Sequence, residues 1–205
     1  MRIVETFISI QGEGPRQGIP CIFVRTAGCN LSCVWCDTQE SHNESHEIEI
    51  TISEIMQEVV ASGLQYVCIT GGEPLLQNEE LIPLVAALHE AGIFVDIETN
   101  GTISFNEVKK YASICMDVKC PSSKERSELS MLNSLRSDDS VKFVIEDYID
   151  YQYMVDILAS HPDLRAQIFI TPVYGTDPKW LIERIIEDKL PVRFQLQLHK
   201  VVDIP

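Results

Sequence analysis

The chain has 205 residues, 45% of them hydrophobic and 23% charged, which excludes a disordered or fibrous protein and suits one folded domain. Sixteen Lys and Arg residues stand against 31 Asp and Glu residues, and the formal net charge is −15. An acidic surface repels phosphate backbones and anionic lipids, so the charge argues against a nucleic-acid or membrane partner. Because the length and composition suit one domain, we expect a single domain over residues 1–205.

The cellular setting is expected to be cytoplasmic. The first residues, MRIVETFISIQGEG, lack the apolar core and cleavage site of a secretory signal, and apolar runs such as LIPLVAAL are too short to span a membrane. Seven cysteines, an odd number, favour reduced thiols or metal ligation over a disulfide framework. Cys21, Cys68 and Cys115 lie in apolar strand patterns and are expected in the core.

Apolar β-branched segments alternate with helical patterns along the chain. The expected strands cover residues 4–9, 21–26, 66–70, 94–98, 114–118, 141–145, 167–171 and 193–198. The expected helices cover residues 53–62, 78–91, 106–111, 148–160 and 178–188. This alternation is typical of an α/β fold with a mainly parallel sheet, either a partial barrel or an open sheet. In both architectures functional residues gather at the carboxyl ends of the strands.

Three cysteines follow the expected strand at residues 21–26, in a short loop of turn-forming residues. Their spacing, Cys29-x3-Cys33-x2-Cys36, lets three thiolates converge on one small inorganic centre. A 4Fe-4S cluster held by three cysteines leaves one iron open to another ligand. In radical S-adenosylmethionine (SAM) enzymes that ligand is SAM, whose cleavage gives a 5′-deoxyadenosyl radical that the protein directs. The triplet therefore predicts a 4Fe-4S cluster that binds SAM.

Two other interpretations of the triplet stay open. Cys33 and Cys36 match a CxxC redox pair, although that pairing leaves Cys29 without a role. A zinc knuckle of three cysteines and one histidine is the stronger alternative, because His42 and His46 lie within reach of the loop.

A second motif, TGGEP, comes directly after the expected strand at residues 66–70. Glycines at a strand end let the backbone approach a ligand closely, so the peptide groups and Glu73 suit the amino group of SAM. The same letters also fit an ordinary turn between a strand and a helix. Together with the cysteine triplet, however, the motif predicts radical SAM chemistry.

Further motifs run from one end of the chain to the other: FISIQGEGPRQGIPCIFVRTAGCNLSC, WCDT, TGGEPLLQ, IETNGT, DVKCPS, TPVYG and QLHKVVDIP. With them the sequence resembles the 7-carboxy-7-deazaguanine synthase family of the queuosine and archaeosine pathways. The resemblance implies a lyase that converts 6-carboxy-5,6,7,8-tetrahydropterin to 7-carboxy-7-deazaguanine with loss of ammonia. It also implies a (β/α)6-type partial barrel, a Mg²⁺ requirement, a homodimer and an electron donor such as flavodoxin or ferredoxin.

The resemblance assigns metal and substrate contacts to individual residues. Thr38 resembles the Mg²⁺ ligand, since a hydroxyl is a hard oxygen donor, although a threonine here also suits a turn. Arg25 suits the substrate carboxylate as a bidentate partner, with a plain salt bridge as the alternative. The terminal carboxylate of Pro205 suits the guanidine-like edge of the pterin, with a frayed tail as the alternative. The other implied substrate contacts are Ile10, Gln11, Gly12 and Thr70.

The resemblance also implies SAM contacts and proton-transfer candidates. Glu98 and His199 are the candidates for proton transfer, because each lies near the end of an expected strand. The implied SAM contacts are Gly72, Glu73, Asp117, Val118, Lys119, Thr171, Pro172, Val173 and Tyr174.

Two further functions remain as alternatives to the lyase. A radical SAM activating enzyme that acts on a protein glycine shares the cysteine triplet and a TGGEP-like turn. A zinc-knuckle binding module without catalysis would use the triplet alone. Iron and sulfide in anaerobically purified protein would distinguish either radical SAM enzyme from the zinc module.

Overall fold

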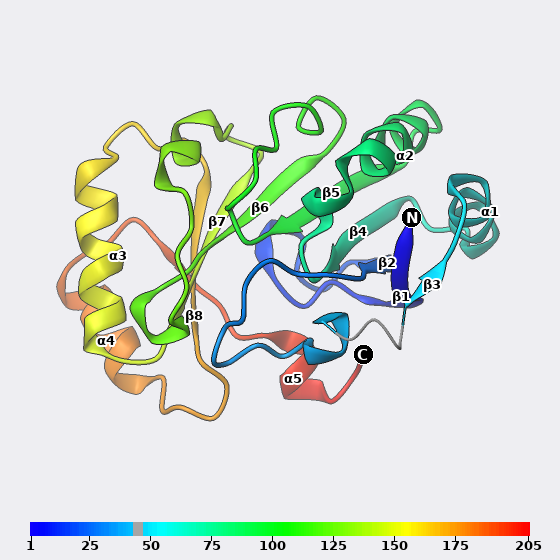
Figure 1. The fold of residues 1–205 in the computed structure, drawn as a ribbon. Helices are drawn as coiled ribbons and strands as arrows, with labels where there is room; N and C mark the ends of the chain where they lie inside the picture. Colours follow the sequence, from blue (N-terminus) through cyan, green and yellow to red (C-terminus); the bar gives the residue numbers. More distant parts are fainter. Residues whose placement is uncertain (43–46) are drawn as a thin grey trace.

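The computed structural model describes residues 1–42 and 47–205, and its described strands form one curved sheet (Figure 1). Their order across the sheet is β3-β1-β2-β4-β5-β6-β7-β8-β9. The strands are β1 (Arg2–Ile10), β2 (Pro20–Thr26), β3 (Ile48–Glu49), β4 (Tyr66–Gly71), β5 (Phe94–Thr99), β6 (Ser113–Val118), β7 (Ser140–Ile145), β8 (Gln167–Pro172) and β9 (Arg193–Phe194).

Strand direction divides this sheet into two parts. β1 runs antiparallel to both β2 and β3, whereas every pair from β2 to β9 is parallel. The parallel strands therefore bring their carboxyl ends to one edge. β3 and β9 lie at opposite ends of the strand order and do not pair, so the sheet is an open partial barrel. The α/β fold class predicted from the sequence is confirmed.

Local sequence signals explain where the connecting helices begin and end. These helices are α1 (Ile52–Ser62), α2 (Asn78–Glu90), α3 (Tyr148–Ser160), α4 (Lys179–Glu187) and the short α5 (Leu198–Val202). A capping box between Thr51 and Glu54 starts α1, and Gly63 ends it in the left-handed conformation that glycine tolerates best. The carboxylate of Asp147 caps α3 by accepting from two backbone N–H groups.

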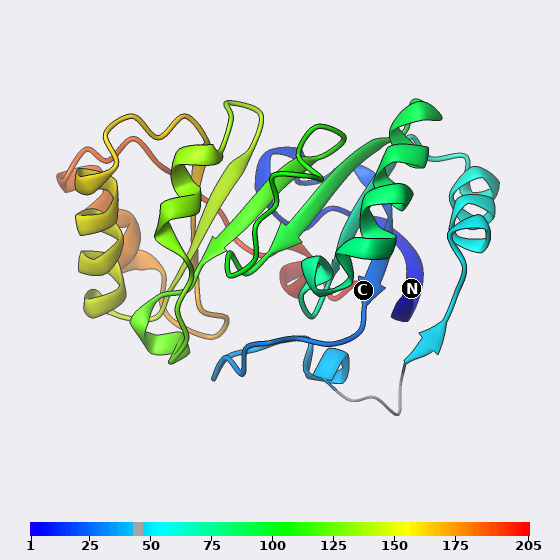
Figure 2. The ribbon, with the colours of Figure 1, turned by 45° about the horizontal axis from the view of Figure 1, so that its top comes forward.

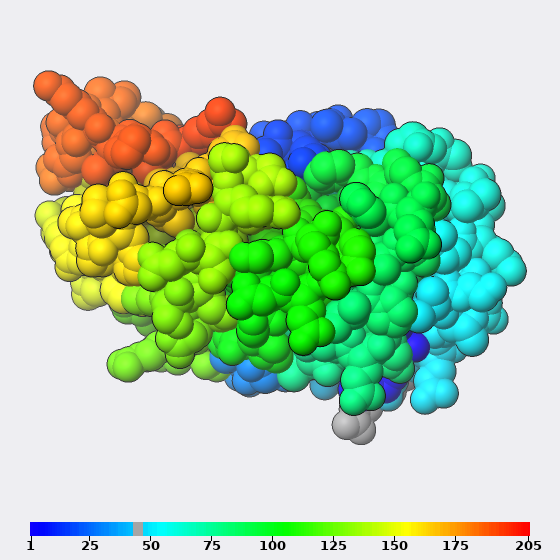
Figure 3. All heavy atoms as spheres, turned by 90° about the horizontal axis from the view of Figure 1, so that it is seen from above, coloured from blue at the N-terminus to red at the C-terminus, as the bar shows by residue number. Residues whose placement is uncertain are grey.

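The helices are spread around the sheet rather than gathered on one part of it. Figures 1 and 2 show α2 beside β5, α1 on the outer side of α2, α3 and α4 together at the β8 end, and α5 apart from both pairs. Seen from above, atoms from the middle of the chain (green) lie between the cyan part on one side and the yellow and orange parts on the other (Figure 3). No helix among the described residues combines the length and apolar character that a membrane span requires.

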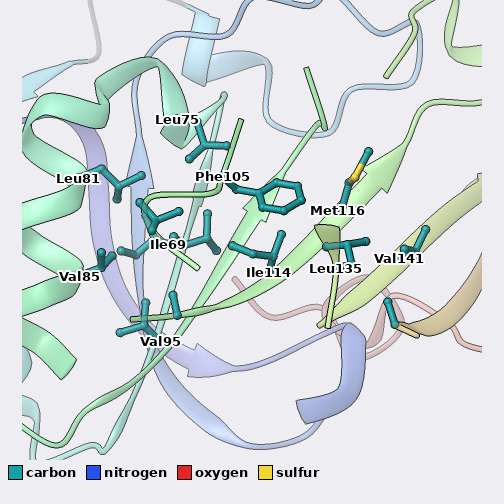
Figure 4. Close-up of a cluster of buried hydrophobic side chains, with 14 of the residues drawn as sticks. Ile69, Leu75, Leu81, Val85, Val95, Phe105, Ile114, Met116, Leu135 and Val141 are labelled. Atoms are coloured by element: carbon teal, nitrogen blue, oxygen red, sulfur yellow. The ribbon is translucent and has the colours of Figure 1, made fainter. Parts of the chain in front are cut away.

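The main core lies between the sheet and helices α1 to α4. Leu81 and Val85 from α2 point toward Ile69 and Val95 on β4 and β5, and Phe105 closes the same cluster (Figure 4). Burying side chains of this size is the main favourable term in folding, at roughly 25 cal/mol per Å² of apolar surface. The expectation that Cys21, Cys68 and Cys115 are core residues is confirmed, since all three are buried.

Two predicted elements differ from the structure. Residues 106–111 form consecutive turns and no helix, because the carbonyls of Phe105 and Val108 each accept two local backbone bonds and those of Asn106 and Glu107 between them accept none. The expected strand at residues 193–198 pairs only over Arg193–Phe194. Beyond it, Gln195 N still donates to Ile170 O on β8 at 2.9 Å, and the side chain of Gln195 bonds to the backbone of Gly14.

Candidate active site

A cavity of about 350 Å³ lies at the carboxyl ends of the parallel strands. Its walls come from strands at both ends of the sequence and from the cysteine loop between β2 and α1. Most of the residues singled out from the sequence line it, namely Ile10, Gln11, Gly12, Arg25, Cys29, Cys33, Cys36, Thr38, Thr70, Gly72, Glu98, Asp117, Lys119, Val173, Tyr174, His199 and Pro205. The residues singled out from the sequence therefore lie together at this edge of the sheet.

The cysteine loop packs directly against the TGGEP turn. The carbonyl of Gly28 accepts from the backbone N–H of Glu73 at 2.8 Å. A Cβ atom built on Gly72 would lie 2.0 Å from that same carbonyl oxygen, so only glycine fits at this position. The backbone of Gly72 lines the cavity beside Cys29. The two motifs therefore form one wall of the cavity. A cofactor bound there could contact both motifs at once.

The three cysteines of the loop suit a cluster better than a single ion. Within residues 1–42 and 47–205, no three His, Cys, Asp or Glu side chains lie close enough to hold one metal ion. A 4Fe-4S cluster does not require that closeness, because each thiolate binds a different iron. For the zinc alternative, His42 lies with its Nε2 3.7 Å from Cys36 Sγ, and His46 lies outside the described residues.

Thiol ionisation at the loop depends on burial and on one nearby cation. Burial raises the pKa of Cys33 to about 11, while Lys119 lowers it. Burial likewise raises the pKa of Cys29. Iron binding favours the thiolate, so the positive charge of a cluster's irons would offset this desolvation. The side chains present therefore fit the cluster.

Glu73 lies behind the cavity wall and not in it. Its carboxylate is fully buried and accepts from Leu75 N at 3.1 Å, Thr99 Oγ1 at 2.9 Å and Asn100 N at 2.7 Å. Burial nonetheless raises its pKa. These contacts join the turn after β4 to the end of β5. The SAM contact predicted for the Glu73 side chain stays a prediction, since the glycine backbone is what faces the cavity.

A line of alternating charges crosses the cavity wall. Lys142 Nζ, on β7, lies 2.7 Å from Glu13 Oε2 and 3.1 Å from Asp117 Oδ1, and Asp117 Oδ2 in turn pairs with Lys119 at 2.8 Å. Although burial opposes ionisation, Lys119 and Lys142 hold the pKa of Asp117 below its usual range. The pKa of Lys142 is raised by its three carboxylate neighbours, Asp117, Glu13 and Glu98, against the effect of burial.

Glu98 and His199, the proton-transfer candidates from the sequence, both have pKa values that burial shifts. Burial raises the pKa of Glu98 to about 7, helped by Glu13 and Asp117 and opposed by Lys142. Its Oε1 accepts from Gln11 Nε2 at 3.2 Å. Burial lowers the pKa of His199, which keeps its imidazole neutral at lower pH than usual. Both side chains line the cavity, so either one is placed to reach a bound molecule.

Comparisons with known proteins agree with this geometry. The model of the radical SAM superfamily matches residues 23–134. The 7-carboxy-7-deazaguanine synthase of Methanospirillum hungatei is 49% identical over all 205 residues, covering 86% of that protein. The chain belongs to this family. The synthase of Thermoplasma acidophilum is 39% identical, with 100% of this chain and 99% of that protein covered. The crystal structure of QueE from Escherichia coli superposes with a TM-score of 0.80 at 25% identity, covering 97% and 94% of the two chains.

Within the synthase family fold, two predicted ligands of the substrate already have protein partners. Arg25 Nε lies 2.9 Å from Glu5 Oε1, and its guanidinium carbon lies 5.3 Å from the centre of the Phe7 ring. The salt bridge considered from the sequence is therefore present, although Arg25 still lines the cavity. Pro205 O accepts from Ser9 Oγ at 2.9 Å, so the tail folds back onto β1 and is not frayed.

Besides Glu73, three residues predicted to contact SAM lie outside the cavity lining. Val118 is buried in the main core, and Thr171 is buried on β8. Pro172 borders a smaller neighbouring hollow of about 160 Å³ that also touches Val173 and Tyr174. Because the side chains of Asp117 and Lys119 line the cavity, the alternation of strand residues places Val118 on the opposite face.

Glu13 and Lys142 also line the cavity, although neither was predicted from the sequence. Glu13 stands in the QGEG motif beside the three residues that were assigned. Lys142 interrupts the otherwise apolar strand SVKFVI, all of which is buried. A lysine in a buried strand is rare unless it is paired, and that signal was available from the sequence.

Proposed function

We propose that this chain converts 6-carboxy-5,6,7,8-tetrahydropterin to 7-carboxy-7-deazaguanine, with loss of ammonia. The observation that carries the proposal is one cavity lined by the cysteine loop and the glycine turn on one side and by Gln11, Arg25 and Glu98 on the other. Relatives named for this synthase, matched over the full chain, support it. The cluster and SAM, when bound, supply the radical that removes a hydrogen from the substrate.

The chain's own residues then bind and orient the pterin. The guanidinium of Arg25 offers N–H groups to the substrate carboxylate, in the fork geometry that suits this pairing. The amide of Gln11, fixed by bonds to Tyr66 Oη and Glu98 Oε1, keeps the floor of the site in one conformation. A pKa of about 7 lets Glu98 give or take a proton at neutral pH as the amine leaves.

Mg²⁺ is part of the proposal, with Thr38 as its protein ligand. Thr38 Oγ1 lines the cavity and lies 3.8 Å from Cys36 Sγ, beside the proposed cluster. One hydroxyl makes a weak Mg²⁺ site alone, so substrate oxygens and water would complete the shell. The isosteric change Thr38→Val should therefore remove the Mg²⁺ dependence of pterin binding and leave iron content unchanged. Unaltered Mg²⁺ dependence in this variant would exclude Thr38 as the ligand.

The proposal includes partners that the sequence resemblance implies. A reduced flavodoxin or ferredoxin is the proposed electron donor, and the exposed Val34 at the tip of the cysteine loop supports an approach on that side. A homodimer of single-domain chains in the cytoplasm is proposed on the same resemblance. Analytical ultracentrifugation of the holoenzyme tests the dimer, and reduction of the cluster by each donor tests the partner.

An anaerobic assay tests the reaction itself. Holoenzyme, SAM, Mg²⁺ and dithionite are incubated with carboxytetrahydropterin, and 7-carboxy-7-deazaguanine and ammonia are measured. Cys33→Ala should lose most of its iron and all product, whereas Cys68→Ala, which changes a buried thiol outside the cavity lining, should keep its iron. Wild-type protein that holds iron and SAM without forming product would contradict the proposed substrate. Zinc in place of iron would favour the binding module.

A further inference from the structure

Glu13 is the carboxylate in the cavity wall with an oxygen still free to accept. Its Oε2 receives Lys142 Nζ at 2.7 Å, whereas its Oε1 is buried and meets no donor in the described part of the chain. The side chain is 7% exposed and lines the cavity. A buried acceptor without a partner is costly, by about 1–3 kcal/mol, so such an oxygen points to a ligand that donates to it.

The loop that carries Glu13 is fixed on both sides. Glu13 N donates to the side-chain oxygen of Gln11 at 3.2 Å. The next residue, Gly14, donates to Gln195 Oε1 at 2.7 Å and accepts from Gln195 Nε2 at 3.0 Å. These bonds of Glu13 N and Gly14, together with the contact between Oε2 and Lys142, hold the carboxylate in place before any ligand binds. A preorganised acceptor of this kind gives specificity at little entropic cost.

Two other carboxylates in the cavity wall, Glu98 and Asp117, are already engaged. Glu98 Oε1 accepts from Gln11 Nε2, and Glu98 Oε2 lies 3.5 Å from Thr70 Oγ1. Asp117 has one oxygen on Lys142 and the other on Lys119. Glu13 alone among these three combines a buried position with an unused oxygen.

We propose that Glu13 is a specificity-determining residue that accepts hydrogen bonds from the 2-amino group and the ring N–H of a 2-amino-4-oxopyrimidine. This inference rests on the proposed function, since that ring is one half of the pterin. The two N–H groups lie side by side, so one can donate to the unused Oε1 and the other to Oε2, which has a second lone pair besides the one that faces Lys142. Lys142 acts as a positioning residue, because it fixes one oxygen and keeps the buried charge paired.

Ligand binding by the intact holoenzyme tests this inference without turnover. Carboxytetrahydropterin is titrated into anaerobic holoenzyme with SAM and Mg²⁺ but without reductant, and so is its analogue that lacks the 2-amino group. Wild-type protein should bind the pterin at least tenfold more tightly than the analogue. In Glu13→Gln the amide nitrogen can no longer accept, so the pterin should lose about tenfold or more in affinity while the analogue loses much less.

The ratio of the two affinities separates recognition from a structural role. Glu90→Gln, the same change on an exposed carboxylate at the end of α2, should keep the wild-type ratio. If Glu13→Gln lowers both affinities equally, or neither, the inference is wrong. Iron content, SAM affinity and thermal midpoint are measured for each variant, and Glu13→Asp, which keeps the charge, should retain part of the discrimination. If wild-type protein binds neither compound, the proposed substrate itself has failed, which is a different result from an unchanged ratio.

Discussion

At the scale of single residues, burial sets the chemistry of the site more than any one charge does. Glu98 shows the effect: burial is the first cause of its pKa of about 7, and the carboxylates of Glu13 and Asp117 add to it. A raised pKa in a carboxyl group has a consequence for stability. The folded chain binds that proton more tightly than the unfolded chain, in which the pKa of the carboxyl is 4.5. Ionisation of Glu98 therefore lowers the stability of the fold.

The change Glu98→Gln tests this linkage. Below pH 4.5 the carboxyl is protonated in both states, so the substitution should change stability little. Between pH 4.5 and about 7 the wild type should lose stability relative to Glu98→Gln, by roughly 3 kcal/mol once ionisation is complete. Thermal midpoints of the two holoenzymes at pH 5 and pH 8 measure the difference. A gap between variant and wild type that is equal at both values would contradict the raised pKa.

At the scale of elements, two glycines hold two loops against their neighbours. A Cβ on Gly72 would meet the Gly28 carbonyl, which is backbone, at 2.0 Å. A Cβ on Gly12 would meet His199 Nδ1 at 2.2 Å, and that imidazole belongs to α5. The first contact ties the glycine turn to the cysteine loop, and the second ties the QGEG loop to the C-terminal segment. The same substitution at the two positions should therefore have different effects.

Gly72→Ala and Gly12→Ala serve as controls for each other. Gly72→Ala should displace the cysteine loop and lower iron content several-fold, because a backbone carbonyl cannot move aside without moving its loop. Gly12→Ala should keep its iron and its SAM affinity but bind the pterin about tenfold or more weakly, since His199 is pushed from its place. Iron content and pterin affinity are measured for both variants and compared with the wild-type values. Pterin affinity unchanged in Gly12→Ala would show that α5 does not contribute to the substrate side.

The sequence predicted the regular parts of these elements better than the irregular ones. Strands such as β5 and β7 were found because β-branched residues recur in short runs, and a parallel sheet then places Glu98 and Asp117 at one edge. The role of Glu73 was not predictable, because its bonds to Thr99 and Asn100 join segments that only the folded chain brings together. Lys142 differs, because a lysine in an apolar strand already indicates a buried ion pair; only the identity of its partners, Glu13 and Asp117, depends on the folded chain.

At the scale of the whole molecule, the two ends of the chain complete the cavity together. Gln17 Nε2 donates to the carbonyls of Gly12 and Leu196, and Leu198 N donates to Gly12 O. Gln195 makes two bonds to the backbone of Gly14. These loops therefore close the side of the cavity proposed to bind the pterin. The opposite wall, formed by the cysteine loop and the glycine turn, follows directly after β2 and β4.

Gln195→Ala should separate these two halves of the site. Removing the amide leaves the buried N–H of Gly14 without a partner, at a cost of about 1–3 kcal/mol, and leaves its carbonyl with only the 3.4 Å bond from Gln17 N. The thermal midpoint should fall by several degrees, and pterin affinity should fall with it, while iron content stays near the wild-type value. Gln167→Ala, at the partly exposed start of β8, is a matched control that should change neither property. Loss of iron in Gln195→Ala would show that the two halves are not independent.

Because segments from both ends of the chain line the cavity, its two sides are completed at different times during synthesis. During synthesis the cysteine loop and the glycine turn leave the ribosome well before Gln195 and α5 are made. The wall proposed to hold the cluster is thus complete in sequence while the substrate side still lacks its C-terminal part. The substrate side can be completed only after Gln195 and α5 have been made, so we expect no pterin binding before that point.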